Sequence, residues 1–66
     1  MKNWKETLIF QTTTLRQTLA KIEIASSKIA LVVDDDMLLL GTVSDGDIRR
    51  GLLAGMELDD SVEHCI

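Results

Sequence analysis

The sequence has one cysteine, Cys65, and no proline or tyrosine among its 66 residues. A single cysteine excludes an intramolecular disulfide, which is the usual staple of very small domains. A lone thiol, with no secretion signal at the start of the chain, is typical of a reducing, cytoplasmic setting. A chain this short buries only about 60% of its unfolded surface when it folds. We therefore expect self-association or a neighbouring domain to stabilise it.

Positive charge and aromatic side chains are also scarce. Seven Lys and Arg residues stand against eleven Asp and Glu, giving a net charge of −4, and the aromatic residues are Trp4 and Phe10. General nucleic-acid binding needs a basic face, and single-strand binding needs aromatic stacking platforms. No apolar run approaches the ~20 residues of a membrane-spanning helix. We expect no nucleic-acid or membrane partner, although a local basic spot for one small anion remains compatible with this composition.

The residues that build metal sites and catalytic centres are present but wrongly spaced. Counted from Asp34, the sixth residue is Leu39 and the twelfth is Asp45, where a calcium loop needs glycine and glutamate. The run Asp34–Asp36 is therefore interpreted as a polar turn. His64 and Cys65 are adjacent, whereas a cysteine–histidine nucleophile pair must converge across a fold onto an orienting group. We expect no metal site and no enzymatic activity from this chain.

The first half of the sequence predicts a strand followed by a helix. A short first strand is expected near Thr7–Phe10. Thr14 and Gln17 form the capping-box pattern T-x-x-Q, which predicts a helix from about Leu15 to Ala25. Apolar residues recur at helical spacing along this segment. The expected buried face comprises Leu15, Leu19, Ile22 and Ala25.

Two apolar runs in the middle of the chain predict a β-hairpin. Lys28–Val33 and Leu38–Ser44 are apolar on both faces, which is typical of strands buried on both sides. The short acidic link between them favours an antiparallel pairing.

A second helix is expected from about Asp45 to Ala54. Ser44 would be its N-cap, and Gly55 lies where a C-terminal cap belongs. The expected apolar face comprises Ile48, Leu52 and Leu53. The order strand, helix, strand, strand, helix predicts an α+β fold, in which two helices cover one face of a small three-stranded sheet.

The pattern S-x-x-D at Ser44 and Asp47 has two compatible interpretations. It is a good helix cap, with Ser44 accepting from the Asp47 N–H and the carboxylate reaching back to Ser44. The start of a helix also presents free N–H groups and a partial positive charge, which suit a phosphate. A carboxylate can accept from two vicinal ribose hydroxyls, and Gly46 lets a ligand approach closely. The spacing therefore also fits a ribose 5′-phosphate.

Arg49 and Arg50 follow this pattern directly. Two arginines on the outside of a helix are ordinarily solvated. One of them can instead reach a phosphate, since arginine forms bidentate pairs with phosphates. Both interpretations stay open at the level of sequence.

The stretch from Thr7 to Val62 resembles a single CBS domain, the cystathionine β-synthase-type module. The resemblance rests on "TTTLRQTLAKI", "KIALVVDDD" and "LLGTVSDGDIRRGL". The signature G-h-h-S-x-x-D-I is matched by Gly41, Thr42, Val43, Ser44, Asp47 and Ile48. More narrowly, "MKNWK" and "LGTVSDGDIRRGLL" resemble the N-terminal CBS segment of bacterial sugar-phosphate nucleotidyltransferases.

This resemblance implies a regulatory module that binds an adenosine nucleotide. CBS domains pair and form clefts for ligands such as AMP, ADP, ATP or S-adenosylmethionine, none of which is required as a cofactor. In such a cleft Asp47 would hold the ribose hydroxyls, and Ser44 would touch the phosphate or ribose. Thr13 or Thr14 would lie near the cleft, and Ala30 and Leu31 would line the base pocket, partly through backbone groups.

The sequence contains one CBS signature where tandem pairs are usual. We expect residues 1–66 to be a single CBS-like domain and a fragment of a longer chain, since the sequence ends on apolar residues. A second CBS domain is therefore the expected partner, supplied by a homodimer of this chain or by a tandem copy in the parent protein. The alternative is a structural dimerisation module with no ligand.

Overall fold

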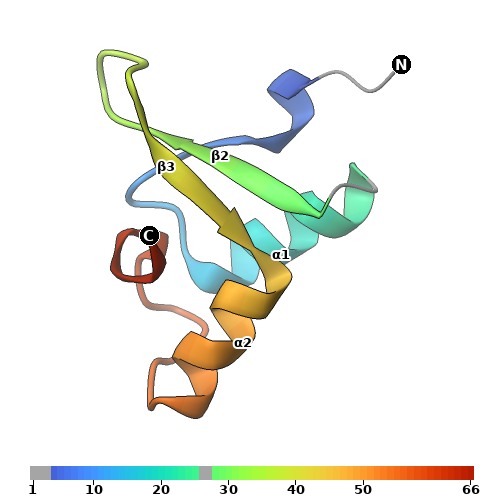
Figure 1. Ribbon diagram of the computed structural model, residues 1–66, viewed down its shortest axis with the longest axis vertical. Coiled ribbons are helices and arrows are strands. Elements are labelled where there is room, and N and C mark those ends of the chain that lie inside the picture. The colour runs from blue at the N-terminus through green and yellow to red at the C-terminus, as the bar shows by residue number, and fades with distance from the viewer. Residues whose placement is uncertain (1–3, 26–27) are drawn as a thin grey trace.

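Three strands and two α-helices form the α+β fold that the sequence predicts (Figure 1). The computed structural model describes residues 4–25 and 28–66, with the backbone alone for residues 4 and 5. Two 3-10 turns, η1 and η2, flank these elements. In chain order the elements are η1 Trp4–Thr7, β1 Leu8–Phe10, α1 Leu15–Ile24, β2 Ile29–Val33, β3 Leu39–Ser44, α2 Asp45–Leu53 and η2 Val62–Cys65.

The sheet has the strand order β1-β2-β3. Strand β1 is parallel to β2 because α1 carries the chain back between them, and β2 is antiparallel to β3. The predicted acidic turn closes this hairpin. Asp34 Oδ1 accepts from the backbone N–H groups of Asp36 and Leu38, at 2.8 and 3.0 Å. These hydrogen bonds confirm the interpretation of the acidic run as a turn.

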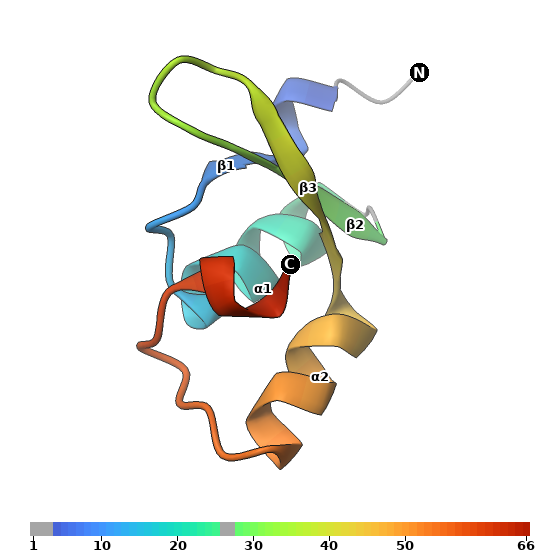
Figure 2. The same cartoon turned by 60° about the vertical axis from the view of Figure 1, so that its left-hand side comes forward.

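One face of the sheet and the two helices enclose the core (Figure 2). Strand residues alternate, so every second side chain of the sheet points toward the helices. Thr7 and Thr18 are buried polar residues, and the Thr18 hydroxyl donates to the carbonyl of Thr14 at 2.8 Å. The core comprises Ile9, Leu15, Ile22, Ala30, Val32, Val43, Ile48 and Val62.

The expectation that β2 and β3 are buried on both sides is wrong for β3 and for the Ile29 end of β2, whereas the adjacent residues Val32 and Val33 are both buried. Ile29 of β2 is 42% exposed, and Val43 is the one buried residue among the six of β3. Both helices lie on the same side of the sheet, so nothing in the described chain covers its other face. Phe10, Ile29 and Leu40 on that face are exposed to solvent.

Both predicted helix caps are present. Thr14 Oγ1 accepts from the Gln17 N–H, and the Gln17 side chain accepts from the Thr14 N–H, each at 3.1 Å. Gly55 has φ 110°, the left-handed conformation that favours glycine just past a helix end. Leu53 does not belong to the apolar face of α2 and is 83% exposed. At 100° per residue it lies about 140° around the helix from buried Ile48, outside the apolar stripe.

The C-terminal segment, residues 56–66, returns across the helices and was not anticipated from sequence. The Val62 N–H donates to the Thr13 carbonyl at 2.7 Å, and the Leu15 N–H donates to the Asp60 carbonyl at 3.0 Å. Val62 is fully buried in the core. A lone apolar residue within polar neighbours has no periodicity, so local sequence does not reveal its burial.

Gly41 of the signature makes room for the end of this segment. A Cβ at position 41 would lie 2.5 Å from Ile66 Cγ2. We expect Gly41→Ala to lower the free energy of unfolding by about 1 kcal/mol through overpacking, at the low end because Ile66 is half exposed and can shift. In an Ile66→Ala background the same change should be neutral or slightly stabilising, because it reduces the entropy of the unfolded chain. Urea unfolding of the four proteins measures this coupling, and equal costs in both backgrounds would contradict it.

Candidate functional site

Ser44 and Asp47 meet where β3 passes into α2. The Asp47 N–H donates to Ser44 Oγ at 3.1 Å, and Asp47 Oδ2 accepts from the Ser44 N–H at 2.9 Å. The predicted capping box is therefore formed. It fixes the direction of the carboxylate at the start of the helix, beside the free N–H groups of the first turn.

The second oxygen of this carboxylate pairs with an arginine. Asp47 Oδ1 contacts the guanidinium Nη2 of Arg50, one turn further along α2. The side chains of Asp47 and Arg50 are 34% and 72% exposed, so the pair faces solvent. The backbone and hydroxyl of Ser44, followed by Arg50, hold the pKa of Asp47 below its ordinary value. Asp47 is consequently ionised at neutral pH.

Gly46 leaves the surface beside this pair open. A Cβ at position 46 would lie 3.6 Å from Ser44 Oγ and 3.7 Å from Arg50 Nη1, which are ordinary contact distances. Packing within the described chain therefore does not demand glycine here. The absent side chain instead leaves the first turn of α2 accessible, with the Arg50 guanidinium alongside it.

The structure separates the two arginines. Arg49 lines a small cavity of about 220 Å³ together with residues of both helices, Leu19, Asp45, Ile48 and Leu52. Arg50 alone of the two is paired with Asp47. Adjacent helix residues point about 100° apart, which accounts for their different surroundings.

Thr13 and Thr14 lie at the entry to α1, as expected, but at the far end of β2 from Ser44. The Gln11 N–H donates to the carbonyl of Val33, whereas Ser44 is paired with Ile29. Ile29 and Val33 are the two ends of β2. One copy of the chain therefore does not bring the two helix starts into a common site.

Ala30 and Leu31 belong to β2 and point to opposite faces of the sheet. Ala30 is fully buried in the core, opposite Val43. A ligand could meet Ala30 through the backbone only. Leu31 is half-buried on the outer face, beside Leu8 of β1.

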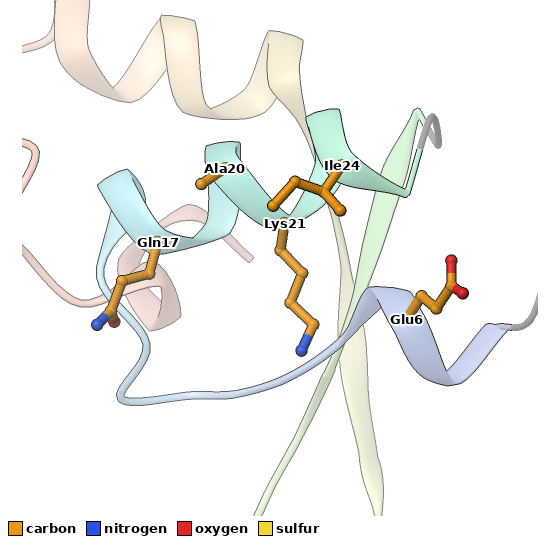
Figure 3. Close-up of a pocket in the computed structure, with 5 residues that line it drawn as sticks. All are labelled: Glu6, Gln17, Ala20, Lys21 and Ile24. Carbon is orange, nitrogen blue, oxygen red and sulfur yellow. The ribbon is translucent and has the colours of Figure 1, made fainter.

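A groove of about 620 Å³ lies elsewhere, between η1 and α1, and was not foreseen from sequence (Figure 3). It mixes apolar and charged side chains, namely Glu6, Gln17, Ala20, Lys21 and Ile24. Figure 3 shows Lys21 extending from α1 toward the segment that follows η1. None of the residues predicted to bind a ligand lines this groove.

Residues 4–25 and 28–66 offer little basis for metal binding or for a cysteine nucleophile. No group of three or more His, Cys, Asp or Glu side chains in these ranges is placed to hold a metal. Cys65 Sγ lies 3.7 Å from Met56 Sδ. Burial, with a contribution from the Asp47 charge, raises the pKa of the Cys65 thiol, which disfavours a thiolate nucleophile.

None of the described helices is long and apolar enough to cross a membrane.

Solved structures reveal which fold this arrangement of elements represents. A CBS domain protein from Pyrobaculum aerophilum, complexed with AMP, superposes with a TM-score of 0.80 at 17% identity, over 98% of this chain and 55% of that chain. A CBS domain pair/ACT domain protein from Thermotoga maritima superposes with a TM-score of 0.73 at 22% identity, over 100% of this chain and 55% of that chain. The chain has the CBS-domain fold. It spans about half of each of these solved CBS chains.

Sequence comparison adds one relative to this CBS-fold chain. An uncharacterized protein of Helicobacter pylori is 43% identical over 47 residues, which are 68% of this chain and 14% of that protein. No protein-family model matches the sequence. The match thus places a similar segment inside a much longer protein.

Two substitutions at Ser44 separate a cap from a ligand contact. Ser44→Ala should lower the free energy of unfolding by about 1 kcal/mol, and Ser44→Gly by only a few tenths. If Ser44 also touches ligand, both should weaken AMP binding to a similar degree despite their different stabilities. Urea unfolding and calorimetric titration measure the two effects. Binding losses in proportion to the stability losses would show that Ser44 acts as a helix cap and does not contact the ligand.

Proposed function

We propose that this chain is a non-catalytic regulatory module that binds an adenosine nucleotide in a cleft completed by a second CBS domain. The observation that carries the proposal is the partly exposed Asp47 carboxylate, fixed by Ser44 at the start of α2 and with a lowered pKa. A protein with the same fold has been solved in complex with AMP. The arrangement offers an acceptor for ribose hydroxyls beside donors for a phosphate.

Each side of the nucleotide has a partner in this arrangement. Asp47 accepts from the ribose hydroxyls, and the hydroxyl of Ser44 donates to the phosphate or ribose. The first turn of α2 and an arginine at position 49 or 50 balance the phosphate charge. AMP, ADP, ATP and S-adenosylmethionine share the adenosine on which this recognition depends. AMP is the ligand used in the tests below.

A second copy of the chain would supply what one copy lacks. Two sheets packed outer face to outer face about a two-fold axis perpendicular to β2 run antiparallel. In that arrangement the Val33 end of one β2 lies near the Ile29 end of the other. Thr13 and Thr14 of one copy would then approach Ser44 of its partner. The proposed cleft therefore lies between two domains, either in a homodimer or in a tandem pair.

The outer face of the sheet also favours a second candidate, a structural dimerisation module without a ligand. This face carries apolar side chains on all three strands, together with Thr42 of β3, and no described element packs over it. Its apolar residues are Leu8, Phe10, Ile29, Leu31 and Leu40. Such a surface favours a partner whether or not a nucleotide binds. Titration with AMP separates the two candidates.

The proposal for the parent protein of this module rests on sequence resemblance. We propose that it belongs to a longer cytoplasmic chain and regulates an attached sugar-phosphate nucleotidyltransferase. The Helicobacter pylori relative supports a place within a longer protein, because the matched residues are 14% of its length.

The first test of the proposed function is a double-mutant cycle, which combines Asp47→Ala with a ligand that lacks the ribose hydroxyls. Two charge-assisted hydrogen bonds of about 1.5–3 kcal/mol each are at stake if the carboxylate holds the ribose. Asp47→Ala should then lower AMP affinity about a hundredfold or more, at 1.4 kcal/mol per decade. The 2′,3′-dideoxy analogue of AMP should bind the unmodified chain comparably weakly, and Asp47→Ala should weaken it little further.

Asp45→Ala is the matched control for this cycle. Asp45 is an exposed acid in the same first turn, so its loss changes the net charge equally. AMP affinity should change little in this control. Additive losses for Asp47→Ala and the dideoxy analogue would show that Asp47 does not bind the ribose, and the dimerisation module would then be favoured.

The second test concerns association. We expect a homodimer at micromolar concentration in analytical ultracentrifugation, made by the apolar outer face of the sheet. Ile29→Lys should shift the chain toward monomer, because it places a charge in that face. Leu53→Lys is the control, since Leu53 is exposed on α2 away from the sheet. A folded monomer, or equal effects of the two substitutions, would contradict this interface.

A further inference from the structure

Strand β2 has opposite charges just beyond its two ends. Lys28 stands directly before the strand, and Asp34 stands directly after it, followed by Asp35 and Asp36. The side chains of Lys28, Asp35 and Asp36 are exposed. Within residues 4–25 and 28–66, none of these three forms an ion pair. They are therefore available to a partner that covers the sheet.

The remaining charges near the Lys28 end cancel. Ser44 is paired with Ile29, so α2 begins at this end of the sheet. The first two turns of α2 carry two acids and two arginines, at positions 45, 47, 49 and 50. Lys28 leaves this end net positive, whereas the hairpin end carries the acidic turn Asp34–Asp36. The two ends of the sheet therefore differ in sign.

This charge pattern makes the outer face of the sheet complementary to itself. Lys28 and Asp34 each lie three residues from Leu31, the middle residue of β2. A two-fold axis perpendicular to β2 and level with Leu31 brings Lys28 of one copy to Asp34 of the other, and the reverse. Opposite charges then meet at both ends of the interface. A two-fold axis parallel to β2 would instead bring one acidic turn against the other.

We propose that a second copy of this chain docks antiparallel on the outer face, with Lys28 of each copy in contact with the acidic turn of the other. The inference rests on the proposed function, because it names the charges that select the partner and its orientation. The apolar side chains of the face supply affinity, and the charges at its rim supply orientation. The turn is prepared for this contact, since Asp34 Oδ1 fixes its backbone by accepting from Asp36 and Leu38.

Charge reversal on either side tests the contact. Asp35→Lys/Asp36→Lys reverses the two exposed acids and keeps Asp34, which closes the turn. Lys28→Glu reverses the other side. Each variant alone should form a homodimer about tenfold weaker than that of the unmodified chain, because like charges then meet at both ends. Sedimentation equilibrium gives the dissociation constants, and circular dichroism checks the fold.

A mixture of the two variants provides the sharper result. In the mixed dimer, the introduced lysines meet the introduced glutamate at one end, and the native acids meet the native lysine at the other. The mixed dimer should therefore recover the affinity of the unmodified chain, about tenfold tighter than either variant alone.

Lys21→Glu is the matched control. Lys21 is an exposed lysine on α1, which covers the opposite face of the sheet. This change alters the net charge as Lys28→Glu does, but at neither end of β2. Its homodimer should stay close to the unmodified affinity. Its mixture with Asp35→Lys/Asp36→Lys should recover only part of the affinity, because one end still brings lysine to lysine.

The outcomes separate this inference from nucleotide binding. Recovery in the mixture with Lys28→Glu, beyond that with Lys21→Glu, supports the inference even if titration detects no AMP binding. Equal recovery in the two mixtures would overturn it and leave AMP binding untouched. Tighter association of Asp35→Lys/Asp36→Lys with the unmodified chain than with Lys28→Glu would indicate turn against turn and would also overturn it. A monomeric unmodified chain would overturn the inference and the homodimer together.

A second measurement needs no variant. The unmodified homodimer should weaken as sodium chloride rises from about 10 to 150 mM, because salt screens exposed ion pairs. General repulsion between two chains of net charge −4 would have the opposite effect. A dimer that tightens over this range would overturn the inference even if a variant failed to fold.

Discussion

Within residues 4–25 and 28–66, the three-stranded sheet has two α-helices to cover it. Both helices pack on one face, where they bury the alternate residues of each strand. The other face stays largely open, because no element of the described residues packs against it. The proposed self-association, the proposed cleft and the expected second domain all depend on this uncovered face of the sheet.

The junction of β3 and α2 combines a helix cap with the proposed binding site. The hydrogen bonds between Ser44 and Asp47 end the strand, begin the helix and orient the carboxylate. The same bonds lower the pKa of Asp47 and keep it ionised. In the proposed function the same carboxylate caps the helix and contacts the ribose, so a stable cap would pre-organise the proposed site.

The C-terminal segment ties the ends of the two helices together. Val62 fills the core and its N–H bonds to Thr13 at the entry to α1, while Cys65 contacts Met56 just beyond α2. Gly41 admits Ile66 against β3. The glycine of the signature therefore has a packing role in this chain, which is separate from any role in ligand binding.

The sequence by itself determined what depends on residues within one turn of each other. Both capping boxes, the acidic hairpin turn and the cap at Gly55 were predicted correctly, because each is closed by bonds between near neighbours. Hydrophobic periodicity determined the α+β class.

Only the tertiary structure decided which apolar faces are covered, and it corrected the burial expected for β2, β3 and Leu53. It also separated Arg50 from Arg49 and set Thr13 and Thr14 at the opposite end of the sheet from Ser44. These features depend on contacts between residues far apart in sequence. Local sequence patterns do not predict which distant surface a side chain will contact.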